Sequence, residues 1–143
     1  MGVLTDIVVA DRSEATAVAQ SSVPSRDWEG IDAKGIEHVK LAQLSAILRH
    51  ESYDPDFVTQ IEDLAEASEE GPWVFRLPQD FVHRLASLGE DETPVVAEKW
   101  AKTEEFILDG WAVSDVASVL SDLHRVAQIA SSKKMALLMW MSL

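Results

Sequence analysis

The sequence predicts an α+β fold that is mainly helical, with a small sheet of two or three strands around a central C-terminal helix. Three observations support this fold class: a strongly apolar helical stretch at 114–132, a β-branched run at 5–10, and an apolar run at 135–141. The length of 143 residues and the apolar content of 47% suffice for one core without disulfide or metal support. We therefore expect residues 1–143 to form a single globular domain.

The stretch 114–132 has the clearest helical pattern in the chain. Apolar side chains cover most of its circumference, and only a narrow stripe is polar. Ser114 suits the N-cap, while Lys133 and Lys134 lie where the helix dipole favours cations. Because so little of this helix is polar, we expect other elements to cover it on several sides.

The remaining elements follow from turn signals and apolar spacing. We expect a strand at 5–10, a short helix at 13–19, a loop at 21–30 and a strand at 73–77. Helices are predicted over 36–50, from Asp54-Pro55 through Ala65, from Pro78 to Gly89, and over 95–108. The run 135–141 suits a buried strand paired with 7–10 or 73–77, although its Met and Leu content also suits a helix.

The charge of the chain limits its partners. A net charge of −13 argues against binding to nucleic acid or to an anionic membrane, since both need a basic surface. Solubility is the commoner reason for such a charge, and a basic protein partner is the alternative. A homo-oligomer is compatible with the sequence. The lack of cysteine, of a secretory leader pattern and of a long apolar run predicts a cytoplasmic protein.

Motifs for common catalytic chemistries are missing. The chain has no glycine-rich phosphate loop, no nucleophile elbow and no metalloprotease histidine pair. His124 lies among apolar residues of the long helix, where a histidine is usually a hydrogen-bonded core residue. We expect no metal site and no cofactor, and the sequence leaves open whether the protein is an enzyme.

Five tryptophans supply candidates for partner binding. Trp28, Trp73 and Trp111 lie beside loop or turn residues, where an indole either packs at the edge of the core or contacts a partner. Core packing is the commoner role. Trp28 is flanked by two carboxylates, which makes it the best contact candidate. The candidate partner-binding residues are Asp27, Trp28, Glu29 and Trp111.

Several segments occur in an order shared with a known family. They are Met1-Gly2, the stretch 30–34 leading into a helix with His38, the stretch 73–82, and a late helix followed by an apolar terminal strand. In this order the chain resembles the YfbM-type family of small bacterial proteins of unknown function. The resemblance implies an α+β fold in a bacterial protein and implies no reaction.

Two functions remain open from the sequence. The first is a non-catalytic protein-interaction or regulatory module that uses an acidic, partly aromatic surface. The second is a small-molecule-binding protein or enzyme whose pocket gathers charged residues from separate segments. The candidate pocket residues are Asp32, Lys34, His38, Arg76 and His83.

Overall fold

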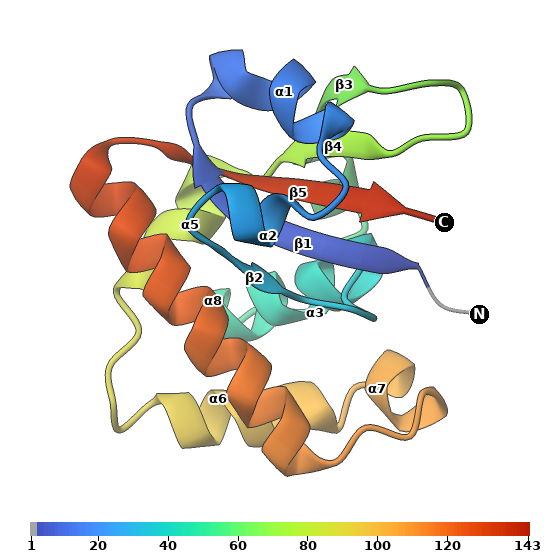
Figure 1. Cartoon of the computed structure of the whole chain (residues 1–143). Coiled ribbons are helices and arrows are strands. Elements are labelled where there is room, and N and C mark those ends of the chain that lie inside the picture. Colours follow the sequence, from blue (N-terminus) through green and yellow to red (C-terminus); the bar gives the residue numbers. More distant parts are fainter. Residues whose placement is uncertain (1–2) are drawn as a thin grey trace.

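A computed structural model describes residues 3–143 and contains one five-stranded antiparallel sheet with helices on both faces (Figure 1). The strand order is β2-β1-β5-β4-β3. The strands are β1 (Leu4–Ala10), β2 (Gly30–Asp32), β3 (Glu62–Glu66), β4 (Trp73–Arg76) and β5 (Ala136–Ser142). The mixed α+β class is confirmed, but the predicted sheet of two or three strands is wrong. The Met1-Gly2 start lies outside the described residues.

Strand β5 lies in the middle of the sheet. It pairs with β1 along its whole length and with β4 on its other side, with Met139 opposite both Ile7 and Phe75. Leu137 and Met139 belong to the core on one face of the sheet, and Leu138 and Trp140 to the core on the other. Burial on both faces explains the continuous apolar run, and the strand prediction for 135–141 is confirmed.

The helices divide between the two faces of the sheet. Helices α1 (Ala15–Gln20) and α2 (Pro24–Asp27) cover one face, after a short 3₁₀ turn, η1, at Arg12–Glu14. The opposite face carries α3 (His38–Arg49), α4 (Asp56–Gln60), α5 (Gln79–Ala86), α6 (Thr93–Ala101), α7 (Glu104–Leu108) and α8 (Val113–Lys133). The larger core lies on this second face.

Helix α8 has the central place that its sequence predicts. It packs between the sheet and helices α5 and α6, and buries Val116, Leu120, Leu123, Val126, Ala127 and Ala130. His124 is fixed by a 2.7 Å hydrogen bond from its Nδ1 to the carbonyl of Leu85, as expected for a structural histidine. The predicted N-cap is wrong, because Ser114 lies within the helix and Ala112 precedes its first residue.

Two predicted segments change type where tertiary pairing outweighs local pattern. The expected loop at 21–30 holds α2, and Gly30 begins β2 by pairing opposite Val8. The helix predicted from Asp54-Pro55 ends at Gln60, and the chain continues as β3. There Leu64 and Ala65 pack against the smaller core instead of continuing a helical face.

The helix predicted over 95–108 is two helices, α6 and α7. The amide and hydroxyl groups of Thr103 both donate to the carbonyl of Trp100, at 3.1 Å and 2.6 Å, and turn the chain there. After this turn Ile107 and Leu108 face outward, with 63% and 72% of their surfaces exposed, although the periodicity predicted them to be inward. No helix in the described residues combines the length and the apolarity needed to cross a bilayer.

Candidate functional site

The candidate partner-binding residues fall into two separate places. Trp28 lies half-buried against the smaller core, and its Nε1–H donates to Glu14 at 3.0 Å. Its exposed neighbours are Asp27, which accepts from the hydroxyl of Ser21 at 2.6 Å, and Glu29. Trp111 packs against the larger core instead. The structure therefore separates Trp111 from the other three candidates.

Trp111 is held firmly from its inner side. Its ring lies 4.9 Å from that of Phe106, and the Nζ of Lys40 lies 5.5 Å from the centre of the indole. A Cβ added to Gly35 would come within 3.0 Å of the indole Cζ2, so a larger residue at Gly35 would press on the ring. The indole position is thus fixed by three different segments.

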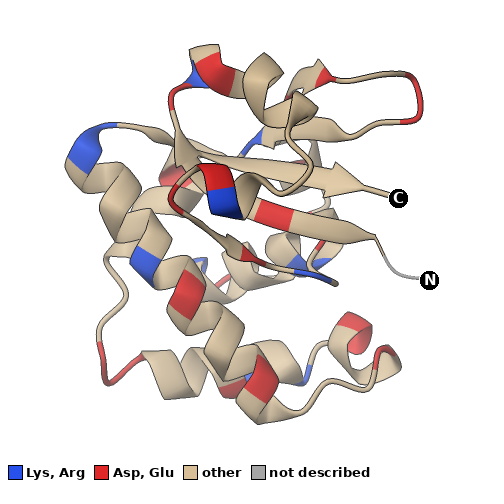
Figure 2. Cartoon of the chain, in the orientation of Figure 1, with Lys and Arg blue, Asp and Glu red and all other residues tan. Residues whose placement is uncertain are grey.

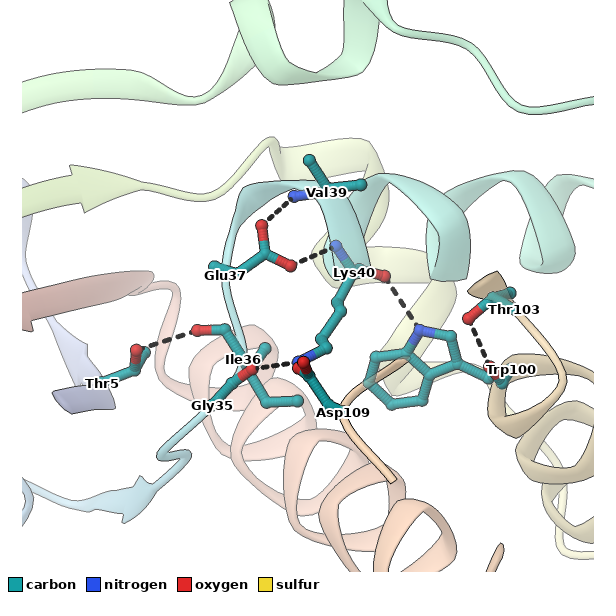
Figure 3. Close-up of polar contacts among 9 residues, drawn as sticks. All are labelled: Thr5, Gly35, Ile36, Glu37, Val39, Lys40, Trp100, Thr103 and Asp109. Carbon is teal, nitrogen blue, oxygen red and sulfur yellow. Dashed lines mark hydrogen bonds and ion pairs between the residues drawn. The ribbon is translucent and has the colours of Figure 1, made fainter. Parts of the chain in front are cut away.

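The lysine behind Trp111 is a feature that the sequence does not reveal. Lys40 is 1% exposed, and its Nζ donates to the carbonyl of Gly35 at 2.6 Å and forms an ion pair with Asp109 (Figure 3). The same ammonium lies 5.1 Å from the centre of the Phe106 ring. A lysine is rarely buried unless it is paired, so this contact set fixes α3 to the α7–α8 turn.

Hydrogen bonds at the start of α3 fix the backbone of this lysine. The carboxylate of Glu37 caps the helix by accepting from the amides of Val39 and Lys40, at 2.8 Å and 3.0 Å. The carbonyl of Lys40 accepts from the indole N–H of Trp100 at 2.9 Å. No sequence pattern distinguishes Lys40 from the solvent-exposed lysines of an ordinary amphipathic helix.

On its outer side Trp111 lines an open acidic hollow of about 420 Å³. We call this hollow the Trp111 groove; it is lined by Asp32, Gly110, Trp111, Asp115, Ser118, Val119 and Asp122. The α8 members recur three or four residues apart, a spacing that places them on one side of the helix. Asp32, Asp115 and Asp122 form no ion pair within the described part of the chain.

The five candidate pocket residues do not form one pocket. Asp32 lies in the Trp111 groove, and the exposed Lys34 donates its backbone N–H to the Asp32 carboxylate at 3.0 Å. His38 packs edge-on against Phe75 with ring centres 4.7 Å apart, and burial of the imidazole lowers its pKa. Arg76 and His83 share a hollow at the far end of the sheet.

The described residues contain no group of three or more His, Asp or Glu side chains placed to hold a metal ion. The acidic residues are instead spread over helices, strands and loops (Figure 2). The three carboxylates of the Trp111 groove can therefore attract a cation from solution or from a partner, without the convergence that metal coordination needs.

Comparison with known proteins gives no relative. No family model, no curated protein and no solved structure matches the chain. The resemblance to the YfbM-type family thus stays a prediction.

Proposed function

We propose that this protein is a non-catalytic interaction module that docks a basic segment of a partner protein in the Trp111 groove. The observation that supports this is one half-buried indole next to three carboxylates that have no cationic partner among the described residues. A lysine or arginine side chain can lie over an indole face while a carboxylate accepts its N–H groups. Tryptophan is also among the residues that contribute most to protein interfaces.

The charges of the groove favour a basic partner over a neutral one. Asp115 and Asp122 lie two turns apart on α8, and Asp32 adds a third negative charge from the end of β2. The net charge of −13 extends this field beyond the groove and accelerates the approach of a positively charged chain. Binding through such exposed charges should weaken as salt is added.

The contacts behind Trp111 prepare the groove for binding. The indole is already positioned by Phe106 and Lys40, so a partner does not have to order it. Ordering a large side chain on binding costs roughly 0.5–1.5 kcal/mol, and a prepositioned ring avoids that cost. A rigid aromatic side chain within an acidic rim is therefore suited to binding a flexible basic segment.

A six-residue arginine peptide is a suitable probe, with a six-residue glutamate peptide as the control. We expect the arginine peptide to shift the indole N–H resonance of Trp111 and the amides of Asp115 and Asp122. Replacing both aspartates with asparagine should weaken binding by about 5- to 30-fold, because two exposed ionic contacts contribute roughly 1–2 kcal/mol together.

A matched variant distinguishes the effect of the groove carboxylates on binding from the effect of the overall net charge. Glu69 and Glu70 lie exposed in the turn between β3 and β4, and changing both to glutamine removes the same two charges. This variant should bind the peptide nearly as tightly as the wild type. Equal weakening in both double variants, or a peptide that leaves the Trp111 resonance unchanged, would refute the proposal.

A further inference from the structure

A second hollow, at the opposite end of the sheet from the Trp111 groove, has the opposite charge. We call it the strand-end hollow; it measures about 490 Å³ and lies where β1 and β4 end and β5 begins. The start of α5 and the end of α8 also contribute to its lining. Its basic side chains are Arg12, Arg76 and Lys134, and His83 lies among them.

The lining of the hollow is basic, although the chain as a whole is acidic. The whole sequence has 12 lysines and arginines against 25 carboxylates, whereas the hollow is lined by three such cations and one carboxylate, that of Asp11. The Asp11 carboxylate accepts the backbone N–H of Ser13 at 2.9 Å and caps η1. Figure 2 shows basic positions at the end of α8 and in the turn after β1.

Two of the three cations are available to a ligand. Arg12 pairs with Glu62 at 2.9 Å, but Arg76 and Lys134 form no ion pair or side-chain hydrogen bond within residues 3–143. Arg76 is half-buried, although Glu62 lies opposite it on β3. A half-buried guanidinium lacks part of its hydration and gains from an anion that replaces the lost water.

Two further groups of the hollow can complement an anion. The hydroxyl of Ser131, a residue that lines the hollow, is buried and has no hydrogen-bond partner in the described structure, so a change of its rotamer toward the hollow would let it donate to an anion. Gln79 begins α5, whose preceding residue, Pro78, supplies no side-chain cap. The first amides of that helix add positive potential at the same place, and the carboxylate of Asp80 in this turn is paired with Arg49 and Arg84.

We propose that the strand-end hollow binds a small phosphorylated metabolite through its phosphoryl group, with Arg76 and Lys134 as the main contacts. A guanidinium matches two oxygens of a phosphoryl group, and a lysine adds a point charge. The volume is within the range of small-molecule sites. The charged lining selects a compact polar anion over an apolar ligand. This site is independent of the proposed docking of a basic segment.

The backbone of Lys134 allows a test that does not depend on loss of folding. Lys134 ends α8 in the left-handed conformation, with φ of 57°, and His50 ends α3 with the same φ. Glycine adopts this conformation without strain, so Lys134→Gly should stabilise the protein while it removes one cation from the hollow. His50→Gly makes the same backbone change at a residue that does not line the hollow, and serves as the matched control.

Calorimetric titration with inorganic phosphate and with pyrophosphate, in about 20 mM salt to limit screening, measures the binding. Arg76→Gln should weaken pyrophosphate binding about tenfold or more, as expected for loss of a charge-assisted contact. Lys134→Gly should weaken it about threefold while raising the melting temperature. His50→Gly should raise the melting temperature alone. Lys133→Gln removes an exposed cation next to Lys134; it should leave pyrophosphate binding nearly unchanged and lower the melting temperature slightly, because a cation is lost from the last turn of α8.

Three results would overturn the proposal. The first is no binding of either phosphate compound up to about 10 mM, a concentration at which even a weak anion site is occupied. The second is unchanged affinity in Arg76→Gln. The third is equally tight binding of citrate, which would show that the hollow does not select a phosphoryl group.

Discussion

Removing Asp109 should destabilise the protein more than removing the charge of Lys40 itself. In Asp109→Ala the buried ammonium keeps only the carbonyl of Gly35 and the aromatic faces as partners. Breaking a fully buried ion pair costs roughly 3–5 kcal/mol. Because the Asp109 side chain is 52% exposed, water compensates part of that loss, and we expect about 2–3 kcal/mol.

Lys40→Met removes the charge together with its need for a partner. Methionine keeps most of the length of the lysine side chain and packs against Phe106 and Trp111. The loss is the hydrogen bond to Gly35 and the contact of the ammonium with the rings, about 1 kcal/mol after the gain in apolar packing. The double variant combines Lys40→Met with Asp109→Ala. Once Lys40 is replaced, the carboxylate at position 109 has no cation to neutralise, so the double variant should be destabilised as much as Lys40→Met alone, within about 0.5 kcal/mol.

Urea unfolding followed by far-ultraviolet circular dichroism measures all three variants. A difference of 1 kcal/mol between the two single variants corresponds to about 2–4 °C in melting temperature, so thermal unfolding gives an independent check. The reasoning fails if Lys40→Met costs more than Asp109→Ala. It also fails if the two effects add in the double variant, since additivity would mean that the two groups do not interact.

Variants at three other positions test separate parts of the fold. Burial lowers the pKa of His38 below its ordinary 6.5, so the imidazole binds a proton more readily in the unfolded chain than in the folded protein. Stability should therefore fall as the pH drops through the region below 6.5. In His38→Phe the urea midpoint should fall less steeply over the same pH range. An unchanged pH slope in that variant would contradict this account. Asp6→Ala removes the carboxylate that accepts the Ser25 amide at 2.9 Å at the start of α2, and should cost about 1 kcal/mol in urea unfolding, while Asp6→Asn should cost less. Equal costs would show that this hydrogen bond contributes nothing. His50→Gly should stabilise the protein by roughly 0.5–1 kcal/mol, because relief of left-handed strain exceeds the added entropy of the unfolded chain; a lower melting temperature would refute this.

The sequence predicts best the elements that bury many apolar side chains. The apolar runs of β1 and β5 and the pattern of α8 identify the centre of the fold, because few other structures can hide so many apolar side chains. The number of strands is not predictable in this way. Strand β2 has only three residues, and its assignment depends on hydrogen bonds to β1.

Local spacing misleads where a strand imitates a helix. Ile61, Leu64 and Ala65 recur at helical intervals, yet in β3 a register shift between Asp63 and Ala65 lets this stretch pair with β4. The Thr103 turn that divides α6 from α7 has a recognisable local signal, since Thr followed by two glutamates is typical of a helix start. The exposed faces of Ile107 and Leu108 follow from that break.

The candidate sites depend on contacts that join distant segments. The sequence indicates both Asp32 and Trp111 as candidates, but only the structure places them in one hollow with Asp115 and Asp122. Arg76 and His83 meet in the same way at the opposite end of the sheet, beside Lys134. The burial of Lys40 could not be predicted, because the residue that neutralises it is 69 positions away.

The position of β5 between β1 and β4 affects how the chain folds as it is synthesised. Strand β1 leaves the ribosome before β5, and the edge that receives β5 stays unpaired until residues 11–135 have followed, on the order of ten seconds at typical elongation rates. During that interval the backbone of the Ile7–Ala10 stretch is open to pairing with another nascent chain. Chaperones that shield extended apolar segments should therefore raise the yield of native protein, most of all when translation is slow.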